Sequence, residues 1–412
     1  MNALLPSSRS LATACLGAIA LASSALGGAC SSEDTPSPAS DADAAASSDG
    51  SLTTDGAASD ANAPSDGGTG ADTSKPLGPP RLYVGSGDGK IRVFAFDRAT
   101  YALTPIDTIA SPANPSFLAI DPARRFLYAG GESSSQITSF SIEPQSGKLT
   151  ALGNSVGSGG NGPAHVSIDR DGRFVLAANY GGGTFAVFPR ASDGRLSASS
   201  ATRSFGGGAQ THQAITDPSN AFVLVPNKGL DAVAVFRLFA DGGLADAGLF
   251  PAGDGARHIA FAPSGKQAYV IDELGSTVSA FTFDPATGAL SSIQPPVSTL
   301  PAPVGGNTGA EIAVTPDGRH VIASNRGDDS LAVFDIDATT FVLTRTARVS
   351  TGGTTPRHFD IDATGQFLFA ANQGSGSVVV MKIDATSGIP TAVGTPLAVP
   401  SPAFAGIFYL SP

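Results

Sequence analysis

The sequence predicts an all-β fold, a seven-bladed β-propeller, on three observations. A short apolar strand recurs seven times after residue 80, at steps of 45, 48, 48, 45, 53 and 47 residues. An alternating strand starts about ten residues after each of them, and alternation with period two is typical of a half-buried strand. Gly and Pro together make 80 of the 412 residues (50 and 30), which favours a turn-rich β protein. Four strands in about 45 residues is the spacing of a propeller blade.

Residues 1–29 read as a signal peptide. Arg9 supplies the positive charge, an uncharged apolar run follows, and small residues precede Cys30. The segment around Cys30 resembles the lipobox of bacterial lipoproteins, with Leu26 one position further from the cysteine than usual. We therefore expect an exported protein, anchored to a membrane through lipidated Cys30, or else a periplasmic or secreted one.

Residues 30–79 are predicted to form a disordered acidic linker. They consist mostly of Ser, Ala, Asp, Gly, Thr and Pro, and so cannot bury enough apolar surface to fold.

Residues 80–412 are predicted to form the propeller, closed by its last strand. The first repeat begins at its second strand, Arg81–Val84, whereas an unpaired apolar strand, 405–410, ends the chain. The C-terminal strand should therefore complete the first blade as its innermost strand, which leaves no open sheet edge.

Composition excludes several classes of site. The two cysteines, Cys15 and Cys30, precede the propeller, so a disulfide scaffold, a Cys-ligated metal or a Cys nucleophile is excluded there. Residues 81–412 carry 22 bases and 26 acids, a net charge of −4, which gives no basic face for nucleic acid. Calcium-ligand spacing is not evident. We expect no metal, no cofactor and a monomer.

Polar residues gather where one mouth of the central channel should lie. Starts of first strands and ends of second strands meet at the same mouth, because the second strand runs back toward the start of the first. Candidate residues at these positions are His165, Asn179, Tyr180, His212, Arg257, His258, Glu273, Glu311, Arg326, Arg357 and His358. The architectural alternative is that repeated His and Asn residues bond neighbouring backbone turns. That alternative is weaker for Arg257, Glu273 and Arg326, because not every repeat has them.

The same residues carry a family resemblance. Gly255-Ala256-Arg257-His258, followed by Ile271-Asp272-Glu273-Leu274, resembles the Gly-Pro-Arg-His and Asn-Glu-Leu signature of the lactonase family. That family includes propeller-type 6-phosphogluconolactonases and carboxy-cis,cis-muconate cyclases. The resemblance implies a seven-bladed propeller with catalytic residues His212, Arg257, Glu273 and Arg326. We expect His165, Asn179, Tyr180, His258, Glu311 and His358 to bind substrate.

Two positions depart from the family pattern. Gln210 and Ala313 stand where the family often has histidine, which indicates a different substrate or weaker activity.

Two functions of different classes follow. The first is a lactone hydrolase acting on a sugar lactone or a related anionic lactone. Glu273 or His212 would be its general base, with Arg257 and Arg326 holding the substrate anion and the oxyanion. The second is a non-catalytic, surface-tethered propeller that binds a small anion or a protein segment. The long connection over residues 295–309 is predicted to line the site beside Arg326.

Overall fold

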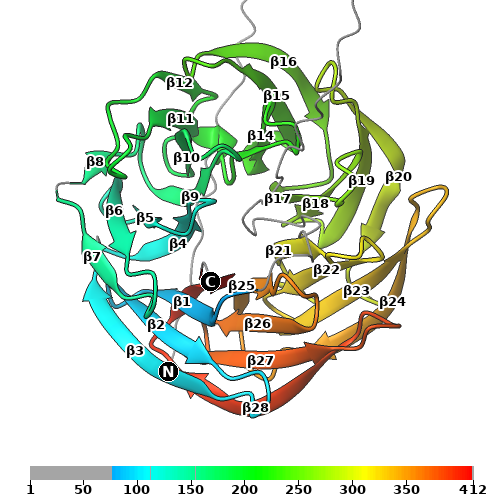
Figure 1. Cartoon of the computed structure of the whole chain (residues 1–412). Coiled ribbons are helices and arrows are strands. Elements are labelled where there is room, and N and C mark those ends of the chain that lie inside the picture. The colour runs from blue at the N-terminus through cyan, green and yellow to red at the C-terminus, as the bar shows by residue number, and fades with distance from the viewer. Residues whose placement is uncertain (1–76, 112, 154, 411–412) are drawn as a thin grey trace, which may run out of the picture. The chain divides into compact units, whose positions relative to one another are not determined.

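The computed structural model describes residues 77–111, 113–153 and 155–410. These residues form seven antiparallel sheets that follow one another around a central axis, as Figure 1 shows. The first strand of each sheet lies next to the axis, and the last lies at the rim. The predicted all-β, seven-bladed propeller is confirmed.

The strands of the first four blades, from the inside outward, have the following bounds. Blade 1 has β29 (Pro402–Tyr409), β1 (Pro80–Ser86), β2 (Lys90–Phe96) and β3 (Leu103–Ala110). Blade 2 has β4 (Pro115–Ile120), β5 (Phe126–Gly131), β6 (Gln136–Ile142), β7 (Leu149–Ala151) and β8 (Val156–Gly157). Blade 3 has β9 (Pro163–Ile168), β10 (Phe174–Asn179), β11 (Thr184–Pro189) and β12 (Ala201–Ser204). Blade 4 has β13 (Ile215–Thr216), β14 (Phe222–Asn227), β15 (Ala232–Leu238) and β16 (Leu244–Pro251).

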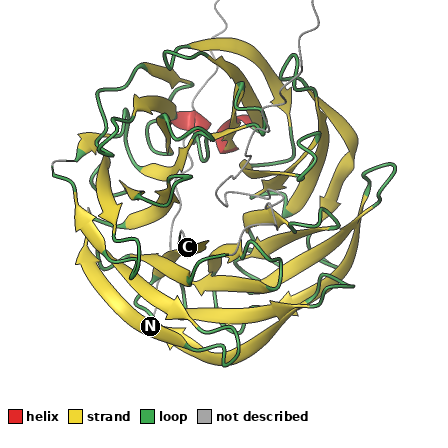
Figure 2. Cartoon of the chain, viewed as in Figure 1, coloured by secondary structure: helices red, strands yellow, loops and turns green. Residues whose placement is uncertain are grey.

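The last three blades are more regular. Blade 5 has β17 (Ala256–Phe261), β18 (Gln267–Asp272), β19 (Thr277–Phe283) and β20 (Leu290–Ser298). Blade 6 has β21 (Gly309–Val314), β22 (His320–Asn325), β23 (Ser330–Ile336) and β24 (Leu343–Ser350). Blade 7 has β25 (Pro356–Ile361), β26 (Phe367–Asn372), β27 (Ser377–Ile383) and β28 (Pro390–Ala398). Two single-turn 3₁₀ helices, η1 (Gly207–Ala209) and η2 (Lys228–Leu230), are the red segments in Figure 2.

The ring closes as predicted. β29 pairs antiparallel with β1, from Pro80 opposite Tyr409 to Gly85 opposite Phe404. The last strand of the chain therefore supplies the innermost strand of the first blade, and every residue of β29 is buried.

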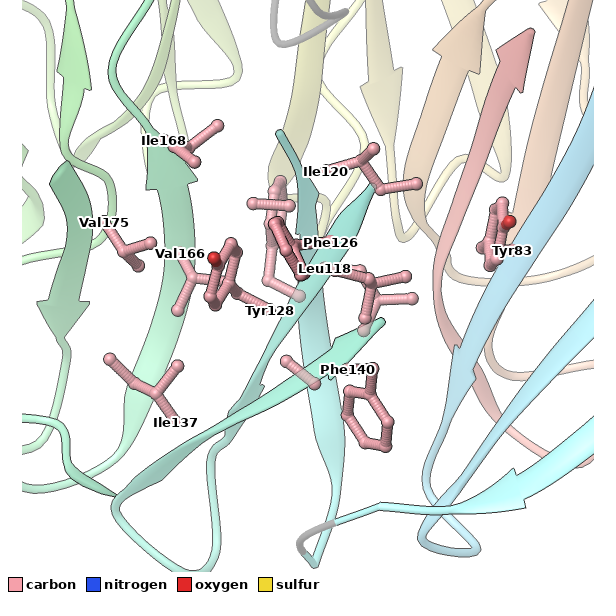
Figure 3. Close-up of a cluster of buried hydrophobic side chains, with 14 of the residues drawn as sticks. Tyr83, Leu118, Ile120, Phe126, Tyr128, Ile137, Phe140, Val166, Ile168 and Val175 are labelled. Atoms are coloured by element: carbon pink, nitrogen blue, oxygen red, sulfur yellow. The ribbon is translucent and has the colours of Figure 1, made fainter. Parts of the chain in front are cut away.

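The hydrophobic core lies between neighbouring blades. Inner strands such as β18 are buried on both faces, while outer strands such as β24 alternate between half-buried and exposed residues after their first residue. Figure 3 shows one of these layers, in which Tyr128, Phe140 and Val166 gather among strands of adjacent blades. Apolar burial on both faces gives most of the stability of such sheets, at about 25 cal/mol per Å².

Blade 2 differs from the predicted four-strand pattern. Its outer strand leaves the sheet edge between Ala151 and Val156, so that β7 and β8 pair separately with β6. This break lies at the rim, away from the channel.

The turns between first and second strands use one repeated device. In four blades a buried aspartate accepts the backbone N–H groups of the residues four and five positions later; Asp217, for example, accepts from Ala221 at 2.8 Å and Phe222 at 2.7 Å. The others are Asp121, Asp169 and Asp362. These turns lie at the end of the blades opposite the predicted site.

The predicted signal peptide, Cys30 and most of the linker lie outside the described residues. Among those that the structure describes, no helix has the length and apolar character needed to cross a membrane.

Candidate active site at the channel mouth

Seven side chains, one from each blade, fill the channel at one level. We call this set the channel layer: Phe404, Phe117, His165, Gln213, His258, Glu311 and His358. Phe117, His165, His258 and His358 each stand opposite the fifth residue of the six-residue second strand of their blade. Phe404 stands opposite Gly85 in β1. The layer closes on its apolar side through Phe117, whose ring centroid lies 4.1 Å from His165 and 4.8 Å from Phe404.

The other side of the channel layer is an arc of polar side chains. His258 Nδ1 lies 2.9 Å from Glu311 Oε1, and Glu311 Oε2 lies 3.6 Å from His358 Nε2. Gln213 Nε2 lies 3.4 Å from His165 Nε2. These five residues come from five different blades, so the spacing of the repeats alone did not reveal their contacts.

Two of the predicted catalytic residues, Arg257 and His212, each precede a residue of the channel layer in the sequence and lie closer to the mouth. Arg257 lies in β17, and His212 lies just before the short strand β13. His212 Nδ1 is 3.1 Å from His258 Nε2, and its ring packs against Tyr180 at a centroid distance of 5.5 Å. The structure therefore brings His212, Arg257 and His258 together, as the sequence predicted.

Glu273 lies at the centre of a cluster of cations. It follows β18 directly, and its Oε2 is 3.1 Å from both Arg257 Nε and Arg326 Nη2. Its Oε1 is 2.7 Å from Lys228 Nζ. Gly255 makes this approach possible: its φ is 82°, and a Cβ there would meet Leu274 N at 2.8 Å. Both carboxylate oxygens of Glu273 are thus occupied by charged donors.

Lys228 is a mouth residue to which the sequence alone assigned no catalytic or binding role. Its ammonium group donates to Tyr180 Oη at 3.1 Å and lies 5.5 Å from the centre of that ring. The signal was present, because Lys228 occupies the position after the second strand of blade 4, as Glu273 does in blade 5 and Arg326 in blade 6. Its partner could not be read from one blade, since Tyr180 and Glu273 belong to the two neighbouring blades.

Burial and charge set the protonation states at this mouth. Burial alone would raise the pKa of Glu273, but Arg257, Arg326 and Lys228 hold it below its usual value. Burial, together with Arg257, lowers the pKa of His212 and of His258 well below 6.5. The site therefore combines an ionised carboxylate, buried cations and neutral imidazoles at neutral pH.

Two further ionisable groups depart from ordinary values. Burial lowers the pKa of Arg257 to about 9, so its guanidinium remains charged at neutral pH. Burial raises the pKa of Glu311 despite the neighbouring His358 and Arg257.

A narrow recess opens over the channel layer. Its lining includes Phe117, Arg257, His258, Glu311, Arg357 and His358, and these side chains leave no interior space for a water molecule. A small molecule can therefore contact them from the solvent side, without entering the channel.

The long connection of blade 5 lies beside Arg326, as predicted. Arg326 N donates to Thr308 O at 2.9 Å, and Arg326 Nη2 donates to Gly309 O at 3.3 Å. Asn307 Oδ1 accepts the N–H groups of Gly327 and Asp328. The connection therefore fixes the segment that carries Arg326.

Asn179 lies apart from the charged cluster. Its amide donates to Ser158 O at 2.9 Å, in the connection that leads from blade 2, and to Thr184 Oγ1 at 3.1 Å, in its own blade. Asn372 bonds Thr351 O in the same way in blade 7. These contacts favour the architectural alternative for the repeated asparagines.

The two positions that depart from the family pattern also lie outside the charged cluster. Ala313 packs in the apolar layer with Phe359 and Ile361. Gln210 ends η1 in a left-handed conformation, with φ at 51°, and its carbonyl accepts Lys228 N at 3.4 Å. In the part of the chain that the structure describes, no group of three or more His, Cys, Asp or Glu residues is placed to hold a metal ion.

Comparison with known proteins finds similar chains of one family. Residues 81–406 match the family model described as lactonase, 7-bladed beta-propeller. A 6-phosphogluconolactonase of Bacillus subtilis is 34% identical over 291 residues, which cover 68% of this chain and 82% of that protein. A 6-phosphogluconolactonase of Pectobacterium carotovorum is 35% identical, over 60% of this chain and 75% of that protein. Among solved structures, a periplasmic gluconolactonase of Pseudomonas aeruginosa superposes with a TM-score of 0.75 at 28% identity, over 81% of this chain and 99% of that one.

Proposed function

The chain belongs to the lactonase family of seven-bladed β-propellers, and from that membership we propose that it hydrolyses a sugar lactone that carries an anionic group. The observation that carries this proposal is the convergence of Lys228, Arg257 and Arg326 on Glu273, beside the neutral imidazole of His212. Three cations around one carboxylate leave positive charge for a phosphate or carboxylate of the substrate.

Binding would place one end of the lactone against the recess. Arg257 and Arg357 both line it, so a carbonyl oxygen placed there meets positive charge. Such charge stabilises the oxyanion that forms when water attacks the carbonyl carbon. The larger, anionic part of the substrate would remain above, near Lys228 and Arg326.

His212 is the better candidate for the general base. Both carboxylate oxygens of Glu273 are already ion-paired with cations, so neither is free to take a proton from water. The Nε2 of His212 has no hydrogen-bond partner among the described residues, while its Nδ1 contacts His258. Glu273 then serves to hold Arg257, Arg326 and Lys228 in place.

The reaction has a simple proton balance. Water attacks the lactone carbonyl while His212 Nε2 takes one of its protons, and the oxyanion forms near the arginines. Collapse of the tetrahedral intermediate breaks the ring C–O bond. The alkoxide leaves with the proton from His212, which returns to its neutral form, and the product is the hydroxy acid.

A turnover assay on the purified full-length chain tests the proposal. Acid release from 6-phosphoglucono-δ-lactone and from glucono-δ-lactone is followed at constant pH, with the spontaneous hydrolysis rate subtracted. We expect faster turnover of the phosphorylated lactone. His212→Asn should lower kcat by roughly 10²–10⁴-fold, the contribution of a general base. His320→Asn is the matched control, because His320 lies at the start of β22, at the opposite end of the blade.

Three outcomes separate the alternatives. Full activity of His212→Asn would leave Glu273 as the base. Absence of turnover with every lactone would overturn the enzyme proposal. Saturable binding of the same compounds without turnover would support the non-catalytic binding propeller instead.

We also propose that the protein is exported and held at a membrane through lipidated Cys30. The apolar N-terminal segment and the lipobox-like residues support this, as does the description of the Pseudomonas aeruginosa relative as periplasmic. Cys30→Ser should abolish labelling by radioactive palmitate and release the protein from the membrane fraction. Unchanged membrane association of the variant would contradict the lipid anchor.

A further inference from the structure

We propose that a chain of polar contacts through His358, Glu311 and His258 fixes the tautomer of His212, so that its Nδ1 carries the proton and its Nε2 presents a lone pair. The chain runs from blade 1 to blade 4 across the polar side of the channel layer. Its three intermediate members are positioning residues, since they act through His212. The consequence for catalysis rests on the proposed function, whereas the tautomer itself does not.

One end of the chain is anchored by a backbone amide. Ala405 N, in the closing strand β29, lies 3.3 Å from His358 Nδ1. A backbone N–H can only donate, so Nδ1 of His358 accepts. Burial lowers the pKa of His358 to about 4, so the ring is neutral near pH 7 and its single proton is on Nε2. That Nε2–H faces Glu311 Oε2 at 3.6 Å.

A second backbone amide identifies Oε1 of Glu311 as a hydrogen-bond acceptor. Ile312 N donates to Glu311 Oε1 at 3.0 Å, and the same oxygen lies 2.9 Å from His258 Nδ1. If burial leads Glu311 to bind a proton, Oε2 is the oxygen that carries it, because Oε1 accepts from Ile312. In either protonation state Oε1 is an acceptor, and His258 Nδ1 must therefore donate.

The position of the proton on His258 then determines that of His212. A neutral His258 that donates from Nδ1 has its lone pair on Nε2, which lies 3.1 Å from His212 Nδ1. His212 must donate to it, since two lone pairs would repel at that distance. The remaining nitrogen of His212, Nε2, is then the basic one. Free imidazole side chains favour the opposite tautomer, so the Nδ1–H form of His212 needs this network.

The same donor and acceptor reasoning predicts the tautomer of His165, through Gln213. Gln213 Oε1 accepts Ile259 N at 2.6 Å, so its amide nitrogen faces His165 Nε2. His165 should then carry its proton on Nδ1, although it lies outside the chain that ends at His212.

Nitrogen-15 spectroscopy of the imidazoles tests the proposal without any substrate. The chain has five histidines, so two-bond ¹H–¹⁵N spectra of the full-length protein labelled with ¹⁵N-histidine contain few signals. Spectra of single His→Asn variants assign them. At neutral pH we expect the Nδ1–H form for His212 and His258 and the Nε2–H form for His358. An Nε2–H form at His212 in the parent protein would overturn the proposal.

Two variants of Glu311 separate the network from a merely structural role. Glu311→Leu removes the acceptor of His258, so His212 should shift toward Nε2–H, and kcat should fall by up to the roughly 10²–10⁴-fold of a general base, with KM changing less. Glu311→Gln retains the Oε1 acceptor and should restore the Nδ1–H signal of His212 and part of kcat. An unchanged His212 tautomer in the folded Leu variant would contradict the chain. If the Leu variant does not fold, the parent and Gln spectra still decide.

The outcomes also distinguish this proposal from the proposed function. The expected tautomers without lactone turnover would support the network and reject the enzyme. Turnover that depends on His212, with Nε2–H at His212, would support the enzyme and reject the network.

Discussion

The two ends of the blades bury carboxylates in different ways. At the turn end, Asp121, Asp169, Asp217 and Asp362 each bond the backbone of their own turn, and the same residue recurs from blade to blade. At the mouth, Glu273 and Glu311 occur once each and bond side chains from neighbouring blades. A buried carboxylate that is satisfied mainly by its own backbone turn serves the fold. One that is held by cations or imidazoles of other blades orders the charged and polar groups of the mouth.

Removal of β29 should have the largest effect on the stability of the protein. Deleting residues 402–412 removes β29, so blade 1 loses its inner strand and His358 loses the Ala405 N–H. We expect no cooperative unfolding transition in calorimetry, because an open ring exposes the inner faces of blades 1 and 7. A truncated chain that melts like the parent would show that closure is dispensable.

Glu273→Gln tests the carboxylate held by side chains. The change leaves Lys228, Arg257 and Arg326 without a counter-charge in a buried cluster. Removing one member of a buried ion pair costs about 3–5 kcal/mol, so the free energy of unfolding in urea should fall by about that amount. Glu143→Gln is the control, because Glu143 lies in an exposed turn. Unchanged stability of Glu273→Gln would mean that the cations find other partners.

Asp217→Ala tests a carboxylate held by its own turn. It leaves the N–H groups of Ser219, Ala221 and Phe222 without their acceptor. Leaving buried donors unpaired costs roughly 1–3 kcal/mol each where water cannot reach them, and partial exposure of this turn brings the expected total to about 2–4 kcal/mol. Activity per folded molecule should be unchanged. A variant that remains folded but loses turnover would break the distinction between the two ends.

Substitution of Asp272 should have the smallest effect on stability, and this effect should depend most on pH. It occupies the repeated asparagine position, and burial raises its pKa to about 7 although Gly253, Thr277 and Ser279 donate to it. A carboxyl whose pKa is higher in the folded chain binds its proton more tightly there, so stability falls as pH rises from about 4 to about 7.

Asp272→Asn should therefore stabilise the protein at pH 8 by roughly 1–3 kcal/mol, with no gain below pH 4. Melting temperatures of both proteins across this range measure the difference. A constant offset at every pH would show that Asp272 does not titrate in this window.

The fold could be predicted because its signals are local and repeated. The seven strand pairs and the unpaired strands at the two ends of the propeller were sufficient for the blade number and the closure at β29. The mouth residues could be predicted because strand direction places His212, Arg257, Glu273 and Arg326 at one end of the blades. The ion pair of Lys228 with Glu273 and the contacts among His258, Glu311 and His358 could not be predicted, because each depends on the distance between different blades. The broken outer strand of blade 2 also lacked a signal in the repeat.

The pairing of β29 with β1 has a consequence for biosynthesis. About 320 residues separate the two strands, so the ring cannot close until residue 409 has left the ribosome. Contacts of such long sequence separation form late, and the blades made first must wait with one sheet edge open. The same strand delivers the Ala405 amide to His358, so the last step of folding would also complete the order of the imidazoles.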